Sequence, residues 1–162
     1  MLRKLFATDN DYALTVVRAV LGIVFLAHGA QKMLGWFGGY GFSGSMGAME
    51  HMGIPSVFAF LAIAAEFFGG LGLLLGLLGR VAAFGIAIEM AVAAATVHAA
   101  NGFFMNWFGN QKGEGFEYHL LAIALGVLLI LRGSGAFSLD RLIARSEQLQ
   151  QRGYRSHSPA AA

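Results

Sequence analysis

Residues 56–78 read SVFAFLAIAAEFFGGLGLLLGLL, a run of apolar and small residues with a single charged side chain, Glu66. The hydrocarbon core of a bilayer is about 30 Å thick, and a helix needs roughly 20 apolar residues to cross it. The run is long enough, and Pro55 directly before it suits the first turn of a helix. It therefore predicts a transmembrane helix that carries Glu66 near the middle of the membrane.

The rest of the chain has the same character. Of its 162 residues, 57% are hydrophobic and 12% are charged, whereas roughly a quarter of an ordinary soluble domain is charged. Three further apolar stretches, residues 12–34, 81–99 and the shorter 118–131, predict three more spans. We predict an all-α fold: an integral membrane four-helix bundle with up-down topology, formed by residues 1–142 as a single domain. A short interfacial helix is expected around residues 138–143, and the polar tail 143–162 is expected to be disordered.

Small residues indicate how the second and third spans pack. Gly69, Gly72 and Gly76 recur at steps of three and four and share one helix face, and the third span carries alanines at similar steps. Faces of small residues let helices approach closely within a membrane. We expect these two faces to be in close contact, with Gly79 and Arg80 as the connection between the two helices.

Lysine and arginine set the expected orientation. They lie before the first span, between the second and third, and after the fourth, whereas the other two connections contain only Lys112. Cytoplasmic loops of membrane proteins are enriched in these residues. Both termini are therefore predicted to be cytoplasmic.

Several function classes are excluded or disfavoured by composition. The chain has no cysteine, which excludes disulfides, cysteine-ligated zinc and iron–sulfur clusters. The net charge is only +2, and the basic residues lie at helix ends, not in a stripe with stacking aromatics, so nucleic acid is not an expected partner. No two histidines have the short helical spacing of a ligand pair, so no metal site is expected.

Four charged residues lie inside the predicted spans: Arg18, Lys32, Glu66 and Glu89. A charged side chain at the centre of a membrane costs about 2.5–3.5 kcal/mol or more. Glu66 and Glu89 should both face the interior, and we expect Arg18 to pair with one of them. One arginine cannot neutralise two carboxylates, which leaves one glutamate able to hold a proton. The alternative is a buried ion pair that only fixes helix packing. The candidate catalytic residues are Glu66, Glu89 and Arg18.

A second group of polar residues lies at the outer ends of the spans. Residues of this group come from three different spans and could form a polar mouth whose side chains bind a small ligand. The aromatic segment 101–109 next to it is either an interfacial anchor or a lid over a flat hydrophobic ligand. The candidate ligand-binding residues are His28, Gln31, Lys32, His98, Glu117 and His119.

With these residues identified, the chain resembles the DoxX family of small four-helix bacterial membrane proteins. The likeness extends from about residue 18 to residue 140. It consists of RAVLGIVFLAHGAQK at 18–32, EFFGG at 66–70, GLLGR at 76–80, HAANGFF at 98–104, Glu117-Tyr118, and Ser138-Leu139-Asp140. The resemblance implies a bacterial cytoplasmic (inner) membrane protein. Relatives include small subunits of membrane redox systems, such as thiosulfate:quinone oxidoreductase and a terminal quinol oxidase, and membrane partners of detoxifying redox enzymes.

Three functional hypotheses remain open. The first is a small subunit of a quinone-linked redox system, in which a glutamate exchanges a proton with a membrane quinone and a partner protein supplies electrons. The second is a non-catalytic scaffold in the lipid bilayer that recruits a soluble redox or detoxification partner. The third is a small proton-coupled transporter, for which four spans are few unless the chain forms a homo-oligomer.

Overall fold

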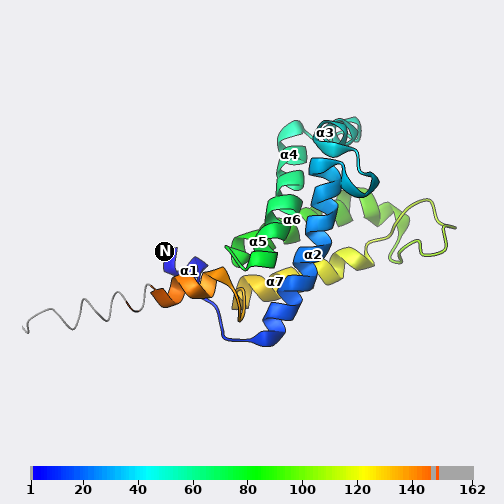
Figure 1. The fold of residues 1–162 in the computed structure, drawn as a ribbon. Helices are drawn as coiled ribbons and strands as arrows, with labels where there is room; N and C mark the ends of the chain where they lie inside the picture. Colours follow the sequence, from blue (N-terminus) through cyan, green and yellow to red (C-terminus); the bar gives the residue numbers. More distant parts are fainter. Residues whose placement is uncertain (1, 147–148, 150–162) are drawn as a thin grey trace, which may run out of the picture.

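A computed structural model describes residues 2–146 and 149, and every regular element within them is helical, which confirms the all-α class. Three stretches are long and apolar enough to cross a membrane: Tyr12–Leu34, Ser56–Leu75 and Gly79–Asn101. In chain order the elements are α1 (Leu2–Leu5), α2 (Tyr12–Leu34), η1 (Trp36–Gly38), α3 (Gly41–His51), α4 (Ser56–Ala64), η2 (Ala65–Gly69), α5 (Gly70–Leu75), α6 (Gly79–Ala93), η3 (Ala94–His98), η4 (Ala99–Asn101) and α7 (Glu117–Arg132) (Figure 1).

The first membrane-length helix, α2, has the expected boundaries. Its N-terminus is capped by Asp11, whose carboxylate accepts hydrogen bonds from the backbone N–H groups of Ala13 at 2.8 Å and Leu14 at 3.4 Å. Its C-terminus is ended by Gly35, which has the left-handed conformation (φ 74°) that glycine adopts without strain.

The hairpin between the second and third stretches differs from the prediction. The second stretch ends at Leu75, because Gly76 adopts a left-handed φ of 64°, and the third begins at Gly79 and continues to Asn101. Residues 76–78, not Gly79 and Arg80, make the connection. The early start has a physical cause: Asp140 accepts the N–H groups of Leu78 and Gly79 at 2.7 and 3.0 Å and so caps α6 from a distant part of the chain.

The fourth apolar stretch is helical, as predicted for residues 118–131, but short. The 16 residues of α7 extend about 24 Å at a rise of about 1.5 Å per residue, less than the roughly 30 Å of a bilayer core. By length and composition, three helices and not four can cross a membrane in the described part of the chain.

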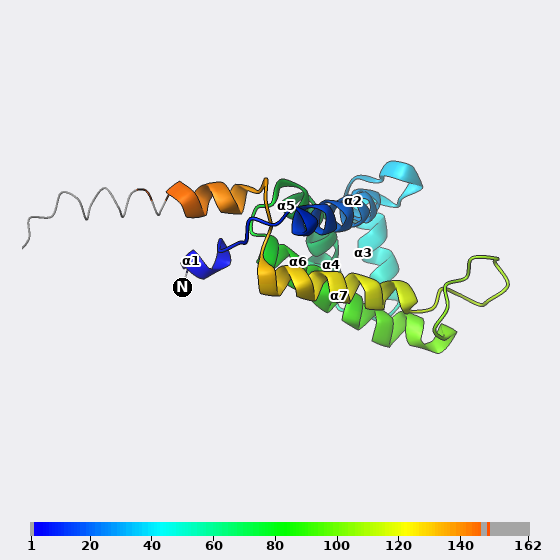
Figure 2. The same ribbon diagram turned by 90° about the horizontal axis from the view of Figure 1, so that it is seen from below.

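Both described chain ends lie at one end of the molecule. Figure 2 shows α1 and the C-terminal helix together at one end, and the loop of residues 102–116 at the opposite end. In this arrangement α7 packs along α6, whereas α2 packs against η2 and α5. The helix α3 lies in the connection after α2 and buries only Ser45.

The closest contact between helices is not the predicted one between the second and third spans. A Cβ atom placed on Gly29 of α2 would overlap the backbone of Phe67, and one on Gly70 would overlap the backbone of Leu26. The contact between Gly69 and α6 is ordinary, with the nearest atom of Ile86 at 3.4 Å from such a Cβ. The tightest contact therefore joins α2 to the second stretch, because the glycines of that stretch lie on more than one face.

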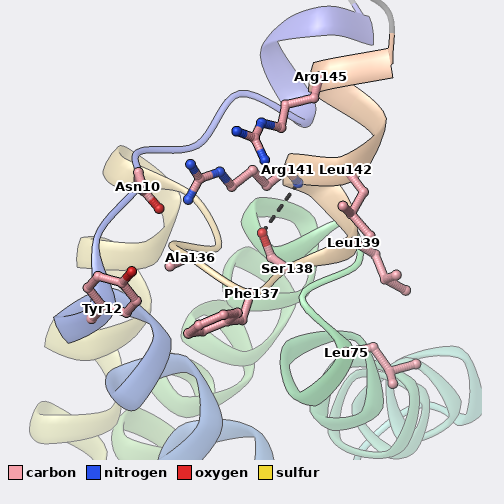
Figure 3. Close-up of a pocket in the computed structure, with 10 residues that line it drawn as sticks. All are labelled: Asn10, Tyr12, Leu75, Ala136, Phe137, Ser138, Leu139, Arg141, Leu142 and Arg145. Carbon is pink, nitrogen blue, oxygen red and sulfur yellow. Dashed lines mark hydrogen bonds between the residues drawn. The ribbon is translucent and has the colours of Figure 1, made fainter.

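The segment after α7 folds back onto the helices. Residues 139–146 are helical, which confirms a short helix near residues 138–143 and extends it into the tail that was predicted to be disordered. The rest of that tail lies mostly outside the described part of the chain. A groove of about 520 Å³ lies between this C-terminal helix, the start of α2 and the end of α5 (Figure 3).

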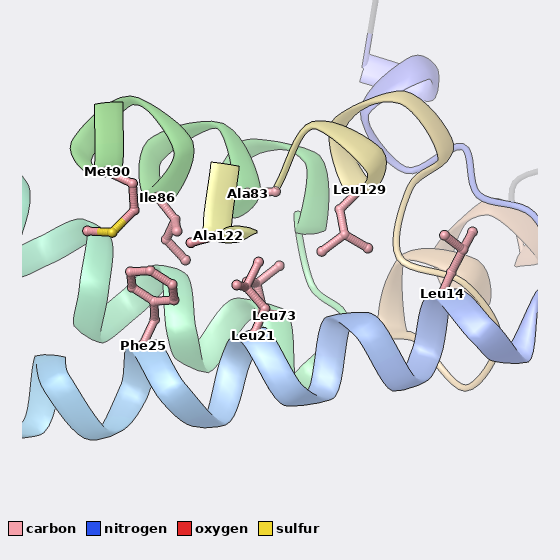
Figure 4. Packing of buried hydrophobic residues seen from close by; sticks show 9 residues of the cluster. All are labelled: Leu14, Leu21, Phe25, Leu73, Ala83, Ile86, Met90, Ala122 and Leu129. Carbon is pink, nitrogen blue, oxygen red and sulfur yellow. The ribbon is translucent and has the colours of Figure 1, made fainter. Parts of the chain in front are cut away.

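The apolar core lies between α2, α5, α6 and α7. Ile86 of α6 and Leu129 of α7 are fully buried, Phe25 of α2 is almost fully buried, and all three belong to one cluster of apolar side chains (Figure 4). Large apolar side chains on the outer faces of the same helices, such as Val20, Phe84 and Leu121, are more than half exposed. An apolar exterior over membrane-length helices is what a lipid environment requires.

The close contact at Gly29 yields a stability prediction. Gly29→Ala should lower the unfolding temperature in detergent by several degrees, because overpacking a close contact costs about 1–3 kcal/mol. The matched control is Gly47→Ala in α3, since a Cβ atom there meets nothing within 4 Å. Equal unfolding temperatures for the two variants would contradict the close packing of α2 on η2.

Candidate functional site

An ion pair joins α2 to the second membrane-length stretch. Lys32 Nζ donates to both carboxylate oxygens of Glu66, at 2.7 Å to Oε1 and 2.5 Å to Oε2. Glu66 is only 4% exposed. The expected location of Glu66 in the interior is confirmed, but its partner is Lys32, which the sequence analysis had assigned to the outer mouth.

The backbone around Glu66 explains this pairing. Glu66 lies in η2, a π-helical turn inserted between α4 and α5, and such turns occur frequently at functional sites. The backbone of α2 reaches this turn because Gly29 has no side chain to separate it from Phe67. Lys32 follows Gly29 by three positions on the same helix face, so the close contact brings the ammonium group to the carboxylate.

Two further side chains complete a buried polar group. Glu89 of α6 lies near both Glu66 and Lys32. Its Oε2 atom is buried and has no hydrogen-bond partner in the described residues. Tyr118 of α7 experiences the charges of both glutamates. We call Lys32, Glu66, Glu89 and Tyr118 the carboxylate cluster.

The carboxylate cluster draws one side chain from each of the four apolar stretches. Its formal charges do not balance if both glutamates are ionised, because one ammonium group faces two carboxylates. A buried charge without a counter-charge is costly. Glu66 and Glu89 thus lie near each other in a common interior, as predicted, with the single ammonium group of Lys32 beside them.

Arg18 does not belong to this cluster, and its predicted pairing with a glutamate is wrong. Arg18 is 2% exposed and binds backbone carbonyls at the end of α5 and in the segment after α7. Nε donates to Ser134 at 2.8 Å, Nη1 donates to Leu73 and to Leu74 (2.7 Å), and Nη2 donates to Phe137 at 3.2 Å. The last carbonyls of a helix lack part of their backbone hydrogen bonding, so a five-donor fork suits the position next to the end of α5.

Asp140 completes the structure around Arg18. It is 1% exposed, accepts the hydroxyl of Ser134 at 2.5 Å, and caps α6 as described above. Asp140 stands in the block Ser138-Leu139-Asp140 that resembles the family, but its role as a helix cap was not predicted from the sequence. In the sequence Asp140 is only an acidic residue after the fourth apolar stretch. Such a residue usually lies in water, so its buried capping role becomes visible only in the folded chain.

The expected polar mouth is only partly assembled. His98 and His119 come together with their ring centroids 4.1 Å apart, and His98 Nδ1 lies 2.8 Å from the carbonyl oxygen of Glu114. Nδ1 of His119 is buried without a partner in the described residues. Glu117 instead accepts the backbone N–H of Met105 at 2.8 Å, which fixes the aromatic loop.

The two remaining mouth residues on α2 do not reach the histidine pair in any recorded contact. His28 is exposed, and its Nδ1 lies 2.9 Å from the carbonyl oxygen of Val24 in its own helix. Gln31 is half-buried and donates weakly to the carbonyl of Phe37 at 3.4 Å. Spacing at i, i+3 and i+4 was a poor guide here, because Lys32 turns toward the second stretch and His28 turns outward.

The fold and the site define a class of protein: a small helical membrane protein with a buried cluster of ionisable side chains. The particular family is shown by comparison, since the DoxX family model matches residues 13–99. The chain belongs to the DoxX family.

Curated relatives match over most of the chain. Inner membrane protein YqjF of Escherichia coli is 32% identical over 134 residues, which cover 83% of this chain and 94% of the relative. Putative oxidoreductase CatD of Bacillus subtilis is 30% identical over 82% of this chain and 88% of the relative. Uncharacterized membrane protein Rv3486 of Mycobacterium tuberculosis is 31% identical over 88% of both chains. No solved structure matches.

The contacts of Arg18 predict a structural effect. Arg18→Lys should lower the free energy of unfolding in detergent by about 2–4 kcal/mol, because a lysine cannot span four carbonyls and leaves several buried acceptors unpaired. Arg132→Lys is the control: this arginine forms an exposed pair with Asp9 at 2.7 Å, and exposed pairs contribute little. Equal stability of the two variants would contradict this assignment.

The Lys32–Glu66 pair predicts a rescue. Lys32→Met leaves a buried carboxylate without its cation and should destabilise the protein by about 3–5 kcal/mol. Adding Glu66→Gln to that variant should restore much of the unfolding temperature, because the amide needs no counter-charge. If the double variant is less stable than Lys32→Met alone, the two side chains do not form the energetically coupled pair seen here.

Proposed function

We propose that the chain is a four-span protein of the bacterial inner membrane with both ends cytoplasmic, and that it serves as the small membrane subunit of a quinone-linked redox system. The topology is supported by the distribution of lysine and arginine and by the common end that α1 and the C-terminal helix occupy. In this proposal α7 crosses as the fourth span, with the bilayer adapting to its shorter length. The name of the Escherichia coli relative supports the inner membrane.

One observation carries the redox part of the proposal: the carboxylate cluster has a buried, unpartnered oxygen on Glu89 beside the paired Glu66. Buried polar atoms are normally hydrogen-bonded, so this oxygen is the one in the cluster that a ligand's polar atom would satisfy. Membrane quinones offer such an atom on an apolar ring. The name of the Bacillus subtilis relative, putative oxidoreductase, agrees with redox chemistry.

The chain's own residues supply proton handling. A quinone, when bound, accepts two electrons and two protons to become a quinol. In this proposal Lys32 holds Glu66 as the carboxylate, and Glu89 is the acid that donates a proton from its unpartnered oxygen to the quinone oxygen. Tyr118 is a further hydrogen-bond donor at the same place.

Electrons come from a partner protein in this proposal. The chain has no cysteine for an iron–sulfur cluster, and its sequence shows no dinucleotide-binding fingerprint. Its part is to hold the quinone and to deliver and remove protons. His98 and His119 form a second polar group, on the elements that precede and begin α7, and they are candidates for the other quinone oxygen.

A second candidate is the non-catalytic scaffold that recruits a soluble redox partner. It is favoured by the use of Arg18, a charged residue of the family block, to hold the C-terminal segment and not to meet the glutamates. The redox subunit and the scaffold make opposite predictions for the glutamates. If the chain is a scaffold, substitutions in the carboxylate cluster that leave the protein stable should not affect its function.

The test is the isoprenoid-quinone content of protein purified in mild detergent. We expect near-stoichiometric quinone in the parent protein and a loss of about tenfold in Glu89→Leu, because one buried hydrogen bond is worth about 1–1.5 kcal/mol. His28→Ala is the control, since it removes an exposed histidine from α2, the same helix as Lys32, and should keep the quinone.

Parent protein without quinone above the lipid background would contradict the redox proposal and favour the scaffold. Equal quinone content in the parent and in Glu89→Leu would place any quinone away from the carboxylate cluster. Unfolding temperatures of all variants distinguish a lost ligand from a lost fold.

A further inference from the structure

The groove at the C-terminal helix has an apolar floor that the protein leaves uncovered. Phe137 is 78% exposed and Leu142 is 61% exposed, and Leu75 at the end of α5 is 48% exposed. All three line the groove, together with Tyr12, whose ring packs on that of Phe137 with centroids 5.6 Å apart. The groove lies beside the ends of α2 and α5, where the apolar helices stop, so its floor continues the membrane-facing surface.

Two arginines stand over this floor. Arg141 and Arg145 are one turn apart on the C-terminal helix, and both side chains point across the groove toward the segment that carries Asn10 (Figure 3). Neither forms an ion pair within the described residues. Two guanidinium groups above an apolar floor match a molecule with an anionic head and an apolar tail.

The nearby carboxylates do not neutralise these arginines, because each is already engaged. Asp9 pairs with Arg132, and Asp11 caps α2. Asp140 directs both oxygens to Leu78, Gly79 and Ser134. None of these carboxylates forms an ion pair with Arg141 or Arg145 in the described part of the chain.

The helix that carries the arginines is held in place before any ligand arrives. The backbone N–H of Asp140 donates to the carbonyl of Gly76 at 2.9 Å, and Arg18 holds the carbonyls of Ser134 and Phe137 from below. A site on a fixed element loses less conformational entropy on binding than a mobile basic tail does.

We propose that this groove binds an anionic phospholipid of the surrounding bilayer. The phosphate accepts hydrogen bonds from Arg141 and Arg145, and an acyl chain lies over Phe137, Leu142 and Leu75. In the proposed topology the groove is at the cytoplasmic side, where anionic lipids attract basic residues. This inference needs the membrane topology of the proposed function but not its quinone, so the two can fail separately.

The experiment uses native mass spectrometry of the full chain in mild detergent, with phosphatidylglycerol and phosphatidylcholine of the same acyl chains as probes. The parent protein should retain phosphatidylglycerol preferentially. Arg141→Gln/Arg145→Gln should weaken its binding about thirtyfold, since two basic residues are lost from the site. The control is Arg152→Gln/Arg155→Gln, which removes the same charge further along the chain and should change binding by less than about threefold.

Three results would overturn the proposal. An equal loss in the control variant would indicate diffuse attraction to the basic tail. Equal retention of phosphatidylcholine would indicate that the arginines do not select the head group. Displacement of lipid by a stoichiometric protein that binds through the two arginines would make the groove a protein interface. Arg145→Gln alone, at an exposed position, should still weaken binding about fivefold if the double variant does not fold.

Discussion

The ion pair between Lys32 and Glu66 is the interaction on which the rest of the membrane core depends. Charges at membrane depth are tolerated only when they are paired or reach water. The need to pair Lys32 with Glu66 therefore restricts how the two helices that carry them can pack. Their meeting requires the backbone of α2 to touch the π-helical turn at Phe67, which only a residue without a side chain at position 29 permits. The glycine contact and the ion pair therefore depend on each other, and together they fix how α2 lies on the second stretch.

Two cations, the buried Arg18 and the partly buried Lys32, lie at different ends of the helices. Arg18 is satisfied by four carbonyls and closes the end where the hairpin and the C-terminal segment meet, whereas Lys32 is used against a carboxylate pair. The hydrogen-bond partners of Arg18 are backbone carbonyls, which do not gain or lose protons. The partner of Lys32 is a carboxylate, which can, so the strength of that pair depends on the protonation of the glutamates. Chemistry that requires a change of charge is therefore expected at Lys32 and not at Arg18.

The fold class and most helix boundaries could be predicted because hydrophobic length is a local property. Residues 12–34 gave α2 without error, and Glu66 and Glu89 were placed in one interior from the spacing of small residues. The partner of Glu66 could not be predicted, because Lys32 lies at the end of its helix and reaches inward only when η2 approaches Gly29. The start of α6 was missed for a similar reason: its cap is Asp140, a residue that is far away in sequence.

The same reasoning explains why Arg18 was misassigned and why the correction strengthens the argument for the carboxylate cluster. Had Arg18 joined Lys32 beside the glutamates, two cations would balance two carboxylates and the cluster would be a closed structural ion network. With Arg18 bound elsewhere, the described residues place one cation against two carboxyl groups. With a second cation absent from the cluster, one positive charge serves two acidic side chains, and this imbalance is what the proposed proton handling uses.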